Sequence, residues 1–318
     1  MDVSIIIVNW NTREILRNCL DSVFRNISGL SCEVIVIDNF SSDGSDIMIK
    51  KYFKQVILIT NKENKGFAAA NNQGMNIATG RYMLLLNSDT IALGDAISKT
   101  IQFADSEPQA AVVGCQILNF DSSIQRSCFM FPSILNMLLS STYLYKIFPR
   151  SKYLGREKMT WWDHADYREV DVLTGCFLLV RRESIEQIGV MDEQFFIYGE
   201  ETDWCWRFKR AGWKCIFAPV GQVIHLGGQS TRLQSGPMLL QLRGSLLLFF
   251  KKNRSYVEYL IACLLTALFF GVRLPWWSIM SLLNPTQESI RTRCYYYAKG
   301  FICSLRGASY LCVRAPHG

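Results

Sequence analysis

The sequence contains no C-x-x-C pair, although 11 cysteines are spread along its 318 residues. Their spacing predicts neither a zinc site nor a disulfide framework. The amino-terminal residues carry no basic stretch and no small-residue cleavage site, which argues against a signal peptide. We therefore expect reduced thiols in a cytoplasmic compartment, most of them buried as small hydrophobic side chains.

A G-x-G-x-x-G loop is also missing after the first apolar stretch, so a dinucleotide is not favoured as a ligand. Charged residues make up only 19% of the chain and hydrophobic residues 49%, which excludes a disordered chain. Residues 236–318 carry ten Lys or Arg and two acids, so the preceding residues sum to −1 within a total of +7. This asymmetry argues against a nucleic-acid partner and places the positive charge on one appendage.

Short apolar runs alternate with helical patterns through the first two thirds of the chain. Strands are predicted at 3–8, 33–38, 55–60, 81–87, 110–118, 175–181 and 214–219, and helices at 12–26, 67–79, 182–188 and 202–211. Continuous apolar strands of this kind are covered by helices on both faces. The expected fold class is α/β, a mostly parallel sheet flanked by helices, with a catalytic domain over residues 1–235 and a helical extension over 236–318.

Two regions depart from this alternation. Residues 128–168 are rich in aromatic residues and are predicted to form a long insertion over the site, either a lid or an acceptor surface. Residues 256–283 are apolar, but Pro275 interrupts them and the first uncharged run is short for a simple span. A broken helix pair at a membrane interface is predicted, with basic flanks facing an anionic cytoplasmic leaflet. A buried hairpin and a true span are the alternatives.

Polar residues follow the first two predicted strands, and ligands of open parallel sheets bind outside the carboxyl ends of the strands. Asn9 and Asn11 follow the first strand, where they either contact a base or ribose or cap the next helix. Asp38 and Asn39 follow the second strand, where an acid accepts hydrogen bonds from a ribose or base. These four residues are candidates for binding the nucleotide of a substrate.

A longer polar run surrounds the fourth strand. Gly66 precedes a predicted helix whose amino terminus suits an anion, and Asn72 lies on that helix. Asn87, Ser88 and Asp89 follow the strand. A divalent cation held by one carboxylate, phosphate oxygens and water neutralises a departing sugar diphosphate, and Asp89 supplies such a carboxylate. Asn87 and Ser88 are candidates for donor binding, and a capped turn is the alternative interpretation.

Three acids, Glu200, Glu201 and Asp203, fall within four positions at the start of the helix predicted at 202–211. Transfer to a hydroxyl needs a general base near the acceptor. Crowded carboxylates raise one another's pKa, which can poise a base near neutral pH. An acidic helix start paired with Arg207 or Lys209 is the alternative.

The segment HLGGQST contributes one further candidate. His225 is predicted to be a metal ligand or a phosphate contact, since neutral imidazole suits both roles. Gly227 and Gly228 would permit a close backbone approach to such a ligand. A lone structural histidine is the alternative.

Taken in order, these segments resemble family 2 glycosyltransferases, particularly the bacterial rhamnosyltransferase-like branch. The resemblance covers roughly residues 3–310 and rests on VSIIIVNWN, CLDSVF, VIVIDNFSSDGS, NKGFAAANNQG, YMLLLNSDT, GCFLLVRRESIEQIGVMDEQFFIYGEETDWCWR, HLGGQST and YYYAKGFICSLRG. It implies a GT-A fold and inverting transfer from a nucleotide diphosphate sugar, helped by Mg²⁺ or Mn²⁺.

The resemblance also implies roles for single residues. Asp38 matches the nucleoside-binding acid, and Asp89 matches the last acid of the D-x-D metal motif. Glu201 falls where the family's base, the Asp of an E-D pair, is found. Asn87 replaces the first Asp of D-x-D, which leaves its contact to ribose or metal open. Glu201 adds one methylene to the base, and Asp203 is its rival.

The activity so implied is transfer of a sugar to a lipid-linked or saccharide acceptor in cell-surface polysaccharide assembly, at the cytoplasmic face of a membrane. The expected donor is dTDP-L-rhamnose, with a UDP-hexose or another deoxysugar nucleotide as the alternative. A nucleotidyltransferase would usually have a glycine-rich loop after the first strand, which NWNTREIL lacks. An inactive binding module is disfavoured by the intact set of Asp89, Glu201 and Asp203.

Overall fold

The computed structural model describes residues 1–27, 29–227 and 235–311. Its centre is a sheet in the strand order β3-β2-β1-β4-β10-β6-β11-β5, with β8 pairing to β11 off this path. The strands are β1 Val3–Asn9, β2 Cys32–Asp38, β3 Ile57–Thr60, β4 Tyr82–Asn87, β5 Thr90–Leu93, β6 Ala110–Leu118, β8 Arg168–Val170, β10 Phe177–Arg181 and β11 Lys214–His225. A separate ribbon pairs β7 Cys128–Phe129 with β9 Val172–Leu173.

The sheet is mostly parallel, as predicted. Strands β1 to β4 run parallel to one another, and so do β6 and β11. Strand β10 lies antiparallel between β4 and β6, and β5 and β8 pair antiparallel with β11. Strands β5, β7, β8 and β9 were not predicted, because they are short and gain their partners from distant parts of the chain.

Helices cover both faces of the sheet. Alternate strand residues point to opposite faces, so Ile5 and Ile7 pack with α1 Arg13–Asn26, while Ile6 packs on the other side with α3 Phe67–Ile77. Each fully buried Ile or Leu of these cores contributes about 2 kcal/mol. The first face also holds α2 Ser45–Tyr52 and α4 Ala96–Ser106, and the second holds α7 Arg182–Ile188 and α8 Glu200–Arg210.

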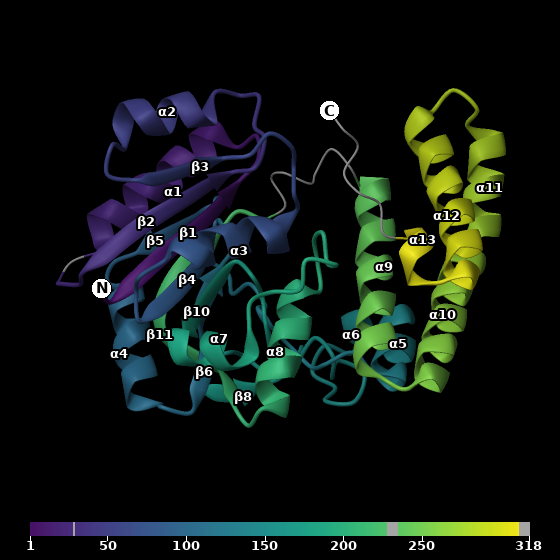
Figure 1. The fold of residues 1–318 in the computed structure, drawn as a ribbon. Helices are drawn as coiled ribbons and strands as arrows, with labels where there is room; N and C mark the ends of the chain where they lie inside the picture. Colours follow the sequence, from purple (N-terminus) through teal and green to yellow (C-terminus); the bar gives the residue numbers. More distant parts are fainter. Residues whose placement is uncertain (28, 228–234, 312–318) are drawn as a thin grey trace.

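The carboxyl-terminal helices stand beside the sheet (Figure 1). They are α9 Ser235–Asn253, α10 Tyr256–Gly271, α11 Leu274–Leu283, α12 Glu288–Arg306 and α13 Ala308–Leu311, and the insertion adds α5 Ile134–Ser141 and α6 Leu144–Ile147. One apolar cluster joins Trp204 and Phe208 of α8 to Phe250 of α9 and Phe270 of α10. The extension therefore shares a core with the sheet-bearing part, and the predicted division at residue 235 stays a prediction.

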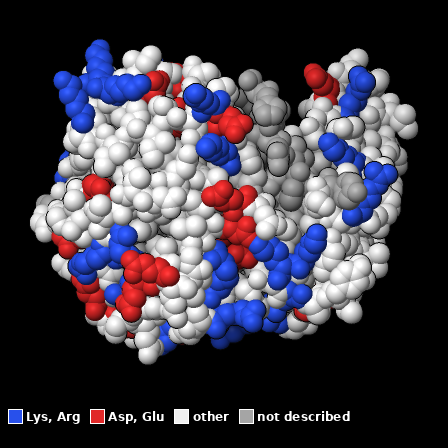
Figure 2. Space-filling view, viewed as in Figure 1, with Lys and Arg blue, Asp and Glu red and all other residues white. Residues whose placement is uncertain are grey.

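The predicted broken helix pair is present as α10 and α11, interrupted at residues 272–273. Pro275 lies in the first turn of α11, where its missing N–H is not needed. The segment Tyr256–Leu283 is long and apolar enough to cross a membrane by length and composition, and only 33% of its most apolar window is buried. Figure 2 shows basic side chains spread over the carboxyl-terminal helices, whose residues include Arg291, Arg293 and Lys299.

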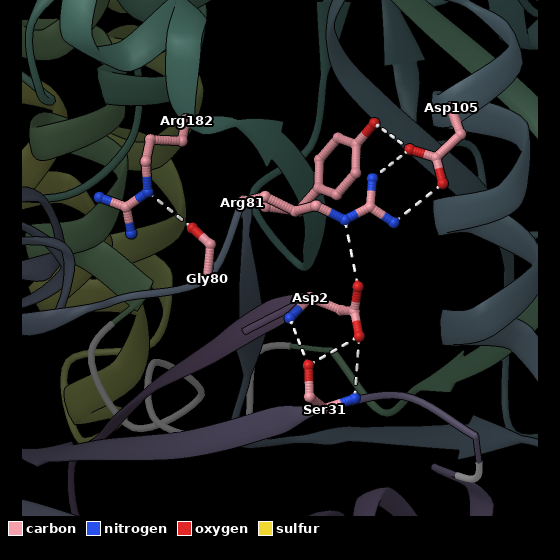
Figure 3. Close-up of polar contacts among 7 residues, drawn as sticks. Asp2, Ser31, Gly80, Arg81, Asp105 and Arg182 are labelled. Carbon is pink, nitrogen blue, oxygen red and sulfur yellow. Dashed lines mark hydrogen bonds and ion pairs between the residues drawn. The ribbon is translucent and has the colours of Figure 1, made fainter.

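The amino ends of the central strands are closed by ion pairs (Figure 3). Arg81, at the start of β4, forms a two-pronged pair with Asp105 of α4 and donates from Nε to Asp2 Oδ1 at 3.2 Å. Hydrogen bonds from Ser31 and Arg81 lower the pKa of Asp2 to about 2. Hydrogen bonding to Arg81 likewise lowers the pKa of Asp105. These contacts therefore have a structural role at this edge of the sheet.

Candidate active site

The carboxyl ends of β1 and β2 hold the first two site candidates side by side. Asn9 and Asp38 are register partners, and Asn9 Nδ2 donates to Asp38 Oδ1 at 2.9 Å. Asn9 Oδ1 accepts from Thr12 Oγ1 at 2.7 Å, and Asp38 Oδ2 accepts from the Ser41 amide at 3.1 Å. Asp38 is only 4% exposed. Asn9 thus orients Asp38, while the carboxylate keeps lone pairs for a further donor.

Asn11 and Asn39 shape the loops around Asp38. Asn11 has φ of 52°, and its Oδ1 accepts from the Ser42 amide at 2.8 Å. Asn39 donates from Nδ2 to the Gly66 carbonyl at 3.2 Å and accepts from the Lys65 amide at 3.0 Å. The side-chain groups of Asn39 are therefore engaged within the protein and fix the loop that precedes α3.

Gly66 and Asn72 join α3 to the segment that leads into α8. Gly66 has φ of 85°, and a Cβ there would lie 2.4 Å from the Phe196 carbonyl oxygen. Asn72 Nδ2 donates to the Met191 carbonyl at 2.9 Å, and the Met191 amide donates back to Asn72 Oδ1 at 3.1 Å. Both residues hold residues 191–199 in place, and through them the start of α8. That positioning role carried no signal in the sequence.

Asp89 and His225 lie together because of the pairing of β5 with β11. That register sets His225 opposite Thr90, and His225 Nε2 lies 3.1 Å from Asp89 Oδ1. Gln125 Oε1 lies 2.6 Å from His225 Nδ1, so in the neutral ring Nδ1 donates and Nε2 is left as an acceptor. Asn87 Nδ2 approaches the same Nε2 at 3.3 Å. Ser88 turns away from this pair.

The side chain of Ser88 is buried instead against α1. Its Oγ lies 3.1 Å from Thr12 Oγ1, and only 7% of the residue is exposed. The Asn87 amide donates to the Cys176 carbonyl at 3.1 Å, which ties the turn to the start of β10. The turn is therefore rigid, and only Asp89 and Asn87 face His225.

The Asp89 and His225 pair fits a divalent cation. Two acceptor atoms at 3.1 Å repel each other unless a cation or proton lies between them. Neighbouring ligands of an octahedral Mg²⁺ or Mn²⁺ lie about 3 Å apart, because each is roughly 2.1 Å from the ion. Among the described residues no group of three or more His, Cys, Asp and Glu is arranged to hold a metal. Substrate phosphates and water would therefore have to complete the coordination.

The acidic cluster lies in the first turn of α8, which begins at Glu200, two residues before its predicted start. Gly199 precedes it with φ of 88°. Glu200 is 3% exposed, and burial followed by the charge of Glu201 raises its pKa well above 4.5. Burial also raises the pKa of Glu201. One carboxylate oxygen of each, Oε2, is buried without a hydrogen-bond partner among the described residues.

Asp203 differs from its two neighbours. It is 1% exposed, and its Oδ2 accepts from Arg207 Nε at 2.8 Å. Its Oδ1 accepts from Asn253 Nδ2, also at 2.8 Å. Arg207 in turn donates to the Val190 carbonyl at 2.9 Å. Asp203 therefore joins α8 to α9 through Asn253. Its pair with Arg207 is the alternative that the sequence allowed.

A cavity of about 460 Å³ opens beside Glu201. Its wall is mainly apolar and aromatic, and its polar lining includes Glu201, Glu157, Lys158, Arg243 and Thr174. Thr174 is two residues from Cys176, whose carbonyl accepts from the amide of Asn87 in the turn before Asp89. The insertion predicted at 128–168 forms one side of the cavity and helices α9 and α10 form the other.

Sequence reasoning missed two of these residues. Gln125 fixes the orientation of the His225 ring, and nothing in its flanking sequence marks it. Arg243 lines the cavity, and its signal was available as a lone charge within the apolar run MLLQLRGSLLLFF. Gly228, named as a possible close-approach glycine, lies outside the described residues.

Comparisons with known proteins identify the family of the chain. The family model described as "Glycosyl transferase family 2" matches residues 4–189. An N-acetylglucosaminyl-diphospho-decaprenol L-rhamnosyltransferase of Mycobacterium tuberculosis is 27% identical over 209 residues, which are 62% of this chain and 67% of the relative. A UDP-Glc:alpha-D-GlcNAc-diphosphoundecaprenol beta-1,3-glucosyltransferase of Escherichia coli, WfaP, is 34% identical over 110 residues, 33% of this chain and 42% of the relative.

The fold also matches a solved structure, the mannosyltransferase PcManGT from Pyrobaculum calidifontis in complex with GDP-Man and Mn²⁺. The TM-score is 0.56 at 13% identity, over 95% of this chain and 85% of the other. At that identity the likeness concerns the fold alone, and it confirms the GT-A expectation.

Proposed function

The chain belongs to glycosyl transferase family 2, and from that premise we propose that it performs inverting transfer of L-rhamnose from dTDP-L-rhamnose to a lipid-linked or saccharide acceptor in cell-surface polysaccharide assembly. The rhamnosyltransferase relative from Mycobacterium tuberculosis supports this choice of donor and a lipid-linked acceptor. A UDP-hexose is the second candidate donor, because the Escherichia coli relative is named for UDP-glucose.

The observation that carries the proposal is the contrast between Glu201 and Asp203. Glu201 lines the cavity and has one carboxylate oxygen without a partner among the described residues, whereas both oxygens of Asp203 are bound. Glu201 is therefore the general base that takes the proton from the acceptor hydroxyl as this oxygen attacks the anomeric carbon. A raised pKa strengthens this base. Attack from the cavity side, opposite the leaving diphosphate, inverts the configuration at that carbon.

The donor end is assigned to the carboxyl ends of β1, β2 and β4. Asp38 accepts hydrogen bonds from the nucleoside, and Asn9 keeps its carboxylate oriented. Asp89 and His225 would hold Mg²⁺ or Mn²⁺, with Asn87 beside them. When bound, this ion supplies positive charge that neutralises the departing diphosphate. Gln125 keeps the imidazole oriented toward Asp89 by accepting the hydrogen of Nδ1.

The carboxyl-terminal helices fit attachment to the inner face of a membrane. Val257, Leu260, Leu264 and Leu268 recur at helical spacing on α10 and are 48–65% exposed, as expected of an apolar face in contact with lipid. Trp276 of α11 is also exposed. Lys and Arg side chains flank this surface and suit anionic headgroups. The proposed location is cytoplasmic and peripheral at the membrane.

A panel of nucleotide sugars tests the proposal. In the presence of Mn²⁺ we expect dTDP-L-rhamnose to raise the melting temperature of the full chain most, and EDTA to remove that shift. The anomeric configuration of the product, read by NMR, should be opposite to that of the donor. A retained configuration would refute the base assigned here, and stabilisation by UDP-glucose alone would move the donor to the second candidate.

A further inference from the structure

Arg243 of α9 lies in the cavity beside Glu201 and has no polar partner within residues 1–27, 29–227 and 235–311. Its Nε is buried without a hydrogen-bond acceptor, and no hydrogen bond or ion pair of its guanidinium is found among the described residues. Its guanidinium stacks on the Phe269 ring, 3.8 Å from the ring centre. Burial lowers its pKa, as expected when a charge has lost water without gaining a counter-ion at bonding distance.

Arg273 shows what a satisfied arginine looks like at the same place. Its guanidinium also stacks on the Phe269 ring, 4.1 Å from the ring centre. Unlike Arg243, it donates to the carbonyls of Phe269 and Ser141, both at 2.9 Å, and it does not line the cavity. Stacking on Phe269 therefore does not require an idle guanidinium. Leaving the Nε–H of Arg243 unpaired in a largely buried position costs stability, so the position of Arg243 favours a ligand.

The cavity around Arg243 favours an anion. Lys158, from the insertion, lines the same wall with its ammonium 4.9 Å from the centre of the Tyr145 ring. Glu157 lies beside Lys158. Burial raises the pKa of Glu157 and so favours its uncharged form, although a hydrogen bond from Ser140 and the nearby cations lower the pKa. In its uncharged form Glu157 adds a hydrogen-bond donor and leaves the carboxylate of Glu201 beside two cations in the described lining.

We propose that Arg243, with Lys158, binds the phosphate groups that join the acceptor sugar to its lipid carrier. This inference rests on the proposed function, because Glu201 places the acceptor hydroxyl in the same cavity. Guanidinium groups suit phosphate through paired hydrogen bonds. Leu239, Leu242 and Leu246 of α9 line the cavity next to Arg243 and provide an apolar wall for the first carbons of a lipid tail.

Two acceptors with the same sugar and the same undecyl tail test the proposal, one joined through a diphosphate and one through an ether. For Arg243→Gln we expect kcat/KM to fall about 100-fold with the diphosphate acceptor and to stay within about twofold with the ether acceptor, since one charged partner is lost. Lys158→Gln should give a smaller fall of the same kind. Arg273→Gln, the matched control on Phe269, should affect both acceptors equally.

A binding experiment without turnover separates this inference from the proposed function. Undecyl diphosphate should bind the wild-type chain in calorimetry and bind Arg243→Gln at least tenfold more weakly, while Arg243→Lys should bind in between. This result stands even if no sugar nucleotide is turned over, in which case the proposed function alone fails. Equal loss with both acceptors, or unchanged diphosphate binding, overturns the inference. A third acceptor, an ether that carries an acidic sugar, tests a different ligand. If Arg243→Gln lowers kcat/KM with this acceptor alone, the site binds a sugar carboxylate, and the inference is overturned.

Discussion

The carboxylates at the amino ends of the strands and those at the start of α8 are held in opposite ways. Asp2 and Asp105 are paired with Arg81 at the sheet edge, and hydrogen bonding lowers the pKa of each (Figure 3). Glu200 and Glu201 each have one buried oxygen with no partner in the described part of the chain, and burial raises the pKa of each. The first pair stabilises the folded chain when charged, whereas the second costs stability when charged.

This difference separates structural acids from acids kept for chemistry. A carboxylate that already has strong donors gains little from a further partner, so it makes a weak base. One that lacks donors is ready to take a proton, and the fold bears the desolvation cost. Asp203 belongs with the structural acids although it is two positions from Glu201.

The largest expected effect lies at the donor end. Asp89→Asn should lower kcat/KM about a thousandfold, because the carboxylate that would hold the cation is lost. Calorimetry with dTDP and Mn²⁺ should show that Mn²⁺ no longer strengthens dTDP binding, while circular dichroism stays unchanged. Asp95→Asn, an exposed acid paired with Lys99 just after β5, is the control and should retain activity. Normal turnover in Asp89→Asn would remove the metal assignment.

Replacing the proposed base is expected to come next. Glu201→Gln should lower kcat by about a hundredfold to a thousandfold, in line with the loss of a general base, and keep donor affinity. Because its oxygen lacks a partner, the melting temperature should not fall. Rapid-mixing kinetics and donor titrations measure both quantities. Unchanged kcat in this variant would show that Glu201 is not the general base.

Asp203→Asn should act on stability instead. Its loss leaves Arg207 short of a partner in a largely buried position, which costs about 2 kcal/mol of unfolding free energy. Urea denaturation measures this, and the remaining folded protein should keep most of its kcat. If Asp203→Asn folds with wild-type stability yet loses kcat, the base is Asp203 and not Glu201.

Glu200→Gln should stabilise the chain in a pH-dependent way. The pKa of Glu200 is raised in the folded protein. Above pH 4.5, its ordinary pKa, the unfolded chain therefore releases a proton that the folded protein still binds. Stability is therefore lost as pH rises from there through the folded pKa, and Gln removes this loss. We expect Glu200→Gln to melt at a higher temperature than wild type at pH 8 and at the same temperature as wild type at pH 4. The exposed Glu183→Gln is the control, and an equal gain in both variants would count against the burial argument.

The smallest effect is expected at the sheet edge, with the opposite dependence on pH. Asp105 has a lowered pKa, so its contribution is present above the ordinary value of 3.8 and is lost as pH falls through the folded pKa. Its side chain is 41% exposed and that of Arg81 is 47%, so the pair contributes no more than about 1 kcal/mol. Asp105→Asn should lower the melting temperature by about 2 °C at pH 7 and leave it unchanged at pH 2. A larger loss at low pH would contradict this sign.

Much of the fold could be predicted because its signals are local. Apolar runs marked β1, β2, β4 and β6, and helical spacing marked α1 and α3. Strand β11 extends to His225, well beyond its predicted end at 219, because its second half pairs with β5, which follows Asp89. That pairing joins residues more than a hundred positions apart and leaves no local pattern in the sequence.

The sequence by itself determined the mostly parallel sheet and the polar residues at its strand ends, since both follow from hydrophobic periodicity and from the order of segments along the chain. Only the tertiary structure set His225 against Asp89 and bound Asp203 to Arg207 and Asn253. It also placed Glu201 and Arg243 at one cavity, each with a buried polar atom that no described residue pairs with. Hydrogen-bond partners and loss of solvent depend on which distant elements pack together, and these decide whether a charged side chain is structural or free to act.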